Sequence, residues 1–154
     1  MGTDTEVVVL AFQLVAAAWM AAAIWIVQLL TYPSFASIDP ATWTGFHARH
    51  SNLITPIVGP AMLLQLLCST WLVLDRPAGI APWATWLGVA LVLITWGVTL
   101  WVSATSHRHL AGAFDAPALR SLVRVNWIRT VAWTALVPVA LLQLVAVAVA
   151  RPGG

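Results

Sequence analysis

The stretch from Trp83 to Thr105 reads WATWLGVALVLITWGVTLWVSAT and contains no charged residue. As an α-helix, about 20 apolar residues cross the hydrocarbon core of a bilayer, which is about 30 Å thick. Tryptophan stands near both ends of the stretch, and tryptophan favours the interface between membrane and water. The stretch therefore predicts a transmembrane helix over 83–105.

Three further stretches have the same character, and they cover 7–30, 53–74 and 128–150. Hydrophobic residues make up 61% of the 154 residues and charged residues only 8%. A soluble domain of this length has too small an interior to bury so much apolar surface, whereas a bilayer solvates it directly. We predict an all-α integral membrane protein, an antiparallel four-helix bundle that forms a single domain over 1–154.

The arginines are distributed unevenly between the two ends of this predicted bundle. Two lie on the side of the second connection, Arg76 and Arg151, and five lie on the side of the first and third connections: Arg49, Arg108, Arg120, Arg124 and Arg129. Cytoplasmic loops carry the excess of positive residues. We therefore expect a multi-pass protein of the inner or plasma membrane, with both termini outside and the first and third connections in the cytoplasm.

The first connection contains a helix signal of its own. Asp39 followed by Pro40 is typical of a helix start, with Asp as the N-cap and Pro at the first helical position. We predict a short interfacial helix over 40–50, and Pro56 and Pro60 inside the second span predict a broken or kinked start to that span. One face of this helix carries Trp43, Phe46, His47 and His50.

The four histidines fall in the first and third connections, as His47 with His50 and as His107 with His109. Neutral imidazole binds Cu, Fe and Zn. His47 and His50 are three residues apart and can converge, whereas residues two apart on a helix diverge. The sequence thus predicts a transition-metal site of His47, His50 and His107, with His109 optional. The alternative is that these are ordinary interfacial histidines.

Polar residues recur at intervals of four along the third span, ending on a histidine: Thr95, Thr99, Ser103 and His107. This stripe predicts an inward-facing, partly wet cavity, with Thr99 and Ser103 available to a substrate. The alternative is that each hydroxyl bonds back to its own helix.

Arg129 lies inside the predicted fourth helix, where Asn126 and Trp133 share its face. An arginine near the hydrocarbon is costly unless it is paired, so it is a candidate functional residue. Gln28 and Tyr32 end the first span at the same side of the bundle. We predict that these five residues bind or act on a substrate. The alternative for Arg129 is that its side chain extends to the interface.

Several short motifs resemble a group of small bacterial four-span membrane proteins related to the anthrone-oxygenase-like family. They are Gln28-Leu-Leu-Thr-Tyr32-Pro33-Ser-Phe35, Phe46-His47-Ala-Arg-His50, His107-Arg-His-Leu110 and Asn126-Trp127-Ile-Arg129-Thr130-Val-Ala-Trp133. The resemblance implies an oxidative tailoring enzyme of natural-product metabolism. The positions that match are Gln28, Tyr32, His47, His107, Asn126, Arg129 and Trp133. Gln65 departs from the pattern, because an acidic residue often stands there in the group.

Two other functions remain open at this point. A second resemblance is to membrane enzymes that form N–N bonds by nitrosation or diazotisation, in which an arginine would suit nitrite. A non-enzymatic carrier of a metal or a small molecule is the third possibility, and so small a protomer would then oligomerise. We expect the bilayer and a small-molecule substrate as partners, and no nucleic acid. The sequence contains no nucleotide-binding motif.

Overall fold

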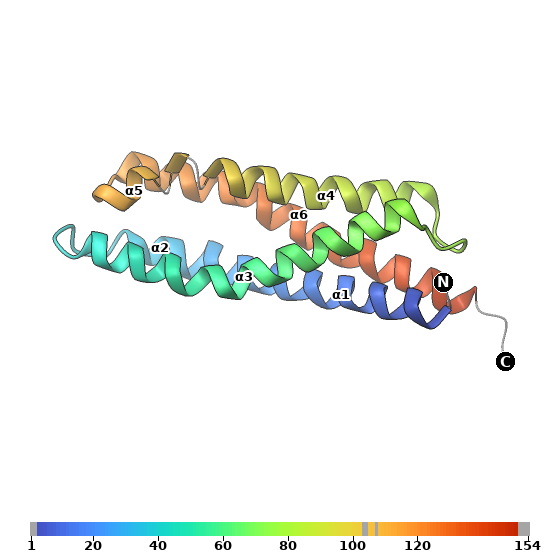
Figure 1. The fold of residues 1–154 in the computed structure, drawn as a ribbon. Helices are drawn as coiled ribbons and strands as arrows, with labels where there is room; N and C mark the ends of the chain where they lie inside the picture. Colours follow the sequence, from blue (N-terminus) through green and yellow to red (C-terminus); the bar gives the residue numbers. More distant parts are fainter. Residues whose placement is uncertain (1–2, 103–104, 107, 151–154) are drawn as a thin grey trace.

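The chain forms an elongated bundle of helices in the computed structural model, which describes residues 3–102, 105–106 and 108–150 (Figure 1). The elements in chain order are α1 Thr3–Ile26, the π-helix η1 Val27–Thr31, α2 Tyr32–Phe35, α3 Trp43–Leu74, α4 Pro82–Val102, α5 Arg108–Gly112 and α6 Ala116–Val149. Four of the resulting helical segments are long and apolar enough to cross a membrane: Asp4–Phe35, Trp43–Leu74, Pro82–Val102 and Ala116–Val149. The predicted all-α four-helix architecture is therefore confirmed.

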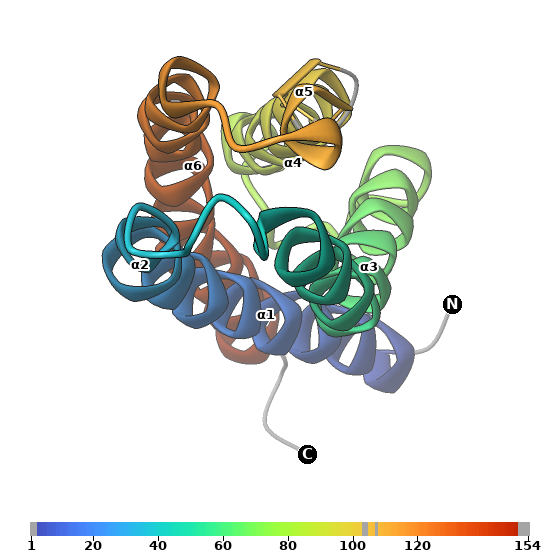
Figure 2. The same cartoon turned by 90° about the vertical axis from the view of Figure 1, so that its left-hand side faces the viewer.

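The four long helices pack in a ring, seen end-on in Figure 2. Helix α1 contacts α3 and α6, and α4 contacts the same two helices. The short elements α2 and α5 lie together at one end of the bundle, where α3 and α6 begin (Figure 1). That end therefore brings together the first and third connections, as an antiparallel arrangement requires.

Helix α3 differs from the prediction, because it is continuous from Trp43 to Leu74. The short helix predicted over 40–50 is not a separate element: its residues 43–50 form the first turns of α3. Asp39 accepts a hydrogen bond from the backbone N–H of Ala41 at 2.8 Å, and the helix N-cap is Thr42. Asp39 thus stabilises the turn before the helix and does not cap it.

The two prolines inside α3 accompany a bend in the helix and do not end it (Figure 1). Proline removes one backbone hydrogen bond, and neighbouring helices can then supply donors in a membrane protein. Trp19 of α1 donates from Nε1 to the carbonyl oxygen of Ile57 at 3.1 Å, and Trp96 of α4 donates to that of Met62 at 3.3 Å. These two indoles hold α3 on either side of Pro60.

Buried amides also join the helices. Gln13 of α1 donates to Ser69 Oγ of α3 at 3.2 Å, and Gln143 of α6 donates to the carbonyl oxygen of Ala84 in α4 at 2.8 Å. Lipid tails are as apolar as the helix surfaces, so close packing and hydrogen bonds of this kind hold membrane helices together.

Helix α6 begins as its sequence predicts. The Asp115 side chain accepts from the backbone N–H of Ala118 at 3.1 Å, with Pro117 in the first turn. The helix has 34 residues, which at about 1.5 Å per residue makes it much longer than a hydrocarbon core of about 30 Å. Counting back about 20 residues from Val149 places the other boundary of the core near Arg129. The first turns of α6 therefore project to the level of the lipid headgroups.

Gly79, in the connection before α4, lies against the far end of α6. A Cβ added there would stand 2.9 Å from the carbonyl oxygen of Ala146 and 3.1 Å from Ala150 Cβ. Backbone atoms cannot give way cheaply, so we expect Gly79→Ala to destabilise the fold by about 1–3 kcal/mol. Thermal unfolding in detergent measures this.

Gly97→Ala is the matched control. Gly97 lies inside α4, and nothing stands within 4 Å of its added Cβ. There the substitution should stabilise the helix by up to about 1 kcal/mol. Equal changes in unfolding temperature at the two positions would contradict the packing of the connection on α6.

Candidate functional site

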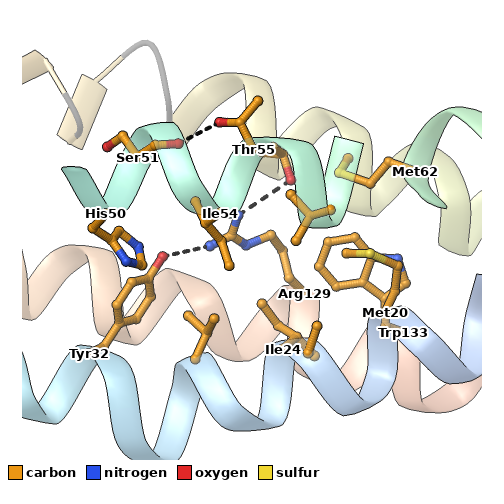
Figure 3. Close-up of a pocket in the computed structure, with 14 residues that line it drawn as sticks. Met20, Ile24, Tyr32, His50, Ser51, Ile54, Thr55, Met62, Arg129 and Trp133 are labelled. Atoms are coloured by element: carbon orange, nitrogen blue, oxygen red, sulfur yellow. Dashed lines mark hydrogen bonds between the residues drawn. The ribbon is translucent and has the colours of Figure 1, made fainter. Parts of the chain in front are cut away.

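A cavity of about 260 Å³ lies among the long helices near the end that carries α2 (Figure 3). Helix α1, η1 and the start of α2 supply Met20, Ala23, Ile24, Val27 and Tyr32; α3 supplies His50, Ser51, Ile54, Thr55, Val58 and Met62; α4 and α6 supply Thr99, Arg129 and Trp133. Most of this wall is apolar. None of the lining residues is acidic.

Arg129 is the single lining residue with a permanent charge, and it is only 7% exposed. The side chain is therefore buried in the bundle and does not extend to the bundle surface. Its Nη2 donates to the Tyr32 hydroxyl at 3.1 Å and to Asn126 Oδ1, and its Nη1 lies 3.5 Å from Thr99 Oγ1. All three partners are neutral oxygens.

The guanidinium of Arg129 has more N–H donors than the hydrogen bonds that it makes to described residues. Arginine has five N–H donors and remains charged at any accessible pH. Three hydrogen bonds are made, and Nε is buried without a partner. A buried cation is ordinarily paired with an anion, because burial removes its hydration. Among the residues that the structure describes, Arg129 therefore provides a positive charge without a counter-charge, beside a mostly apolar cavity.

A relay of amides orients Arg129 from behind. Gln28 in η1 accepts from Asn126 Nδ2 at 2.6 Å and donates to the carbonyl oxygen of Val123 at 3.4 Å. Asn126 in turn accepts from Arg129. Gln28 and Asn126 do not line the cavity, and they position the guanidinium from behind it. Single π-turns inside α-helices are frequent at functional sites.

Trp133 forms the inner wall of the cavity, one turn beyond Arg129. It is 1% exposed and donates from Nε1 to Gln65 Oε1 at 3.0 Å. The Gln65 Nε2 donor is buried without a partner. An acidic side chain at this position would accept the same bond and leave no donor unpaired.

His50 is the one histidine that lines this cavity among the residues that the structure describes. It is half-buried, and its ring meets Phe35 edge-on, with the centroids 4.9 Å apart. Figure 3 shows it beside Tyr32 at one end of the cavity. An imidazole there can accept or donate a proton next to a group held by Arg129.

The other predicted histidines lie elsewhere. His47 is buried, packs on the Trp43 ring at 5.6 Å, and lines a neighbouring hollow with Arg108. His109 is exposed on α5. His107 and Ser103 lie outside the described residues. The structure thus brings His50 to the Arg129 cavity and turns His47 away from it, although Ser51 lines both spaces.

No three His, Cys, Asp or Glu side chains in the described part of the chain are placed to hold a metal ion. Because His107 lies outside the described residues, the predicted metal site of His47, His50 and His107 stays a prediction.

The two described threonines of the polar stripe on α4 make different contacts. Thr99 lines the cavity and contacts Arg129, as expected for an inward-facing residue. Thr95 instead donates to the carbonyl oxygen of Val92 in its own helix at 2.8 Å.

Sequence reasoning missed the apolar lining, which includes Met20, Ile54 and Met62. In a membrane span, lipid-facing and interior residues are equally apolar, so a pattern of hydrophobicity does not identify the interior ones. The sequence offered one chemical indication of the interior, namely the flexible side chains of Met20 and Met62 in spans rich in Leu, Val and Ala.

Comparison with protein-family models, with curated proteins and with solved structures gave no match for this chain.

Proposed function

We propose that the protein is a membrane-embedded enzyme that binds a small, largely apolar organic molecule through an oxyanion or carbonyl oxygen. The observation that carries this proposal is the buried Arg129, whose described partners are all neutral and which lines a mostly apolar cavity. An anionic oxygen on the ligand would supply the missing counter-charge. Arginine is suited to this because its hydrogen bonds to anionic oxygen are charge-assisted.

The shape of the cavity supports an organic ligand over a bare inorganic anion. A volume of about 260 Å³ suits a molecule of one or two fused rings, near the lower limit of ordinary ligand pockets. The methionines, Ile54 and Trp133 would contact the apolar body, while Arg129, Tyr32 and Thr99 would meet the polar end.

The reaction that we propose follows the resemblance to oxidative tailoring enzymes. His50 would take a proton from a carbon next to a carbonyl, and Arg129 would stabilise the resulting enolate oxygen. The enolate would then react with O₂, which is the oxidant. In the balanced reaction a methylene group and O₂ give a carbonyl group and water.

Ligand binding can be tested without knowing the natural substrate. We expect 2-naphthoate to raise the unfolding temperature of the protein in nanodiscs, and the methyl ester of the same acid to raise it less. The two probes share an apolar body and differ in charge, and a hydrogen bond to a charged group contributes about 1.5–3 kcal/mol. Equal effects of acid and ester would contradict the anion-binding role.

Turnover is measured separately, as O₂ consumption with 2-tetralone, a two-ring ketone that has a methylene group next to its carbonyl. Consumption above that of a protein-free nanodisc supports the enzyme. If the protein binds naphthoate but consumes neither O₂ nor nitrite with any organic probe, it would instead be a carrier of small molecules.

We also propose that the end carrying α2 and α5 faces the cytoplasm, which the arginine distribution supports. A cysteine placed at Ser37 or Gly112, which are both exposed at that end, should resist an impermeant thiol reagent in intact cells and react after lysis. The natural Cys68 is buried, so its background should be low. Labelling in intact cells would reverse the orientation.

A further inference from the structure

A second site lies on the outer surface of the bundle, in a groove of about 420 Å³ between α2 and the first turns of α6. We propose that this groove binds the headgroup of an anionic phospholipid, with the phosphate between Arg120 and Arg124. This proposal is independent of the reaction proposed for the cavity.

The two arginines lie four residues apart on α6, so their side chains project from the same face of the helix. Both are exposed, and none of the residues lining the groove is acidic. Like charges at this spacing destabilise a helix. An anion that bridges the two guanidinium groups would remove the repulsion and form charge-assisted hydrogen bonds.

The depth of the groove selects a lipid as the source of that anion. Counting along α6 from the hydrocarbon boundary near Arg129, Arg124 lies about 7 Å and Arg120 about 13 Å outside it, which is the headgroup layer. Trp127, also in the groove, is 42% exposed and meets Trp25 edge-on at 5.6 Å. Paired tryptophans of this kind mark the membrane interface.

The remainder of the groove suits the glycerol and the upper acyl chain. Between and below the arginines it is lined by Leu119, Val123, Ala36 and Pro33. A free phosphate ion would leave this apolar surface uncovered, whereas a phospholipid would cover it. The back of the groove is the Tyr32 ring, whose hydroxyl faces Arg129 in the cavity.

The test uses the full chain in detergent, titrated with phosphatidylglycerol or phosphatidylcholine of identical acyl chains and observed by native mass spectrometry. We expect phosphatidylglycerol to bind at least about tenfold more tightly. Each basic residue near an anionic surface contributes enough to change affinity about fivefold, so Arg120→Gln with Arg124→Gln should weaken phosphatidylglycerol binding about thirtyfold. Binding of phosphatidylcholine should change little.

Two further variants act as controls. Arg49→Gln removes an exposed arginine of α3 that does not line the groove, and it should leave the preference intact. Arg120→Lys with Arg124→Lys keeps both charges and should retain most of the affinity, which separates charge from any disturbance of α6. Equal affinity for the two lipids in the unchanged protein, or an unchanged preference in the double Gln variant, would overturn the proposal. Displacement of phosphatidylglycerol by an equal concentration of inorganic phosphate would also overturn it, by assigning the site to a soluble anion.

Discussion

Turnover in the Arg129→Lys protein should fall by about 10²–10³-fold, the usual loss when one donor to a developing oxyanion is removed. Lysine keeps the positive charge but is shorter and lacks the planar set of donors. It cannot hold Tyr32, Asn126 and a ligand oxygen at the same time, as the guanidinium is placed to do. The measurement is O₂ consumption with 2-tetralone in nanodiscs.

The Arg129→Met protein separates this role from a structural one. It should lose the extra stabilisation by naphthoate over its methyl ester, yet unfold within a few degrees of the unchanged protein. Removing a buried cation that has no anionic partner offsets the loss of its hydrogen bonds to neutral groups. The matched control is Arg49→Lys, at an exposed position of α3, and it should be silent. Collapse of the fold in Arg129→Met, with full activity in Arg129→Lys, would make Arg129 a structural residue only.

The second large effect is expected at His50. Replacing it by Gln keeps a polar side chain of similar size but removes the group that gains and loses a proton, so turnover should fall by about 10²–10⁴-fold. Naphthoate should still bind within about twofold, because Arg129 provides its counter-charge. His109→Gln, at an exposed site on α5, serves as the control and should retain activity. Loss of naphthoate binding in His50→Gln would show that the ring shapes the cavity and does not transfer a proton.

Metal analysis of the same proteins addresses the predicted histidine site. An imidazole nitrogen bound to a metal cannot also accept a proton, so the base role and the metal role of that nitrogen in His50 exclude each other. A transition metal near one equivalent per chain, lost in both His107→Ala and His50→Gln, would favour the metal site. Metal-free protein with full turnover would favour the base.

The broad fold followed from sequence because uncharged stretches such as 83–105 have one stable solution in a bilayer. The prediction of a separate short helix over 40–50 was wrong, because α3 runs without a break from Trp43 to Leu74. Pro56 and Pro60 usually break a helix in water, but in this bundle α3 continues through them, and the indoles of Trp19 and Trp96 donate to carbonyl oxygens nearby. Donors from other helices are not visible in a local sequence pattern.

The polar centre of the site was largely predicted, since Arg129, Asn126, Gln28 and Tyr32 are conspicuous in an apolar chain and the structure joins them through hydrogen bonds. The histidines were harder. His47 and His50 are three residues apart, which is about 60° short of a full turn. That difference is enough for them to line separate spaces.

The π-turn at Val27–Thr31 has a consequence for how this chain tolerates changes in length. The amide of Tyr32 donates to the carbonyl oxygen of Val27, five residues back, so this turn holds one residue more than an α-helical turn. Leu30 is 66% exposed. Deleting it would let this turn become α-helical while Tyr32 kept its orientation toward the bundle. Gln28 would lose the bulge that sets its reach to Asn126. A one-residue deletion inside a transmembrane helix ordinarily disrupts folding. Here the protein should still fold, and the main change should be in the orientation of Arg129.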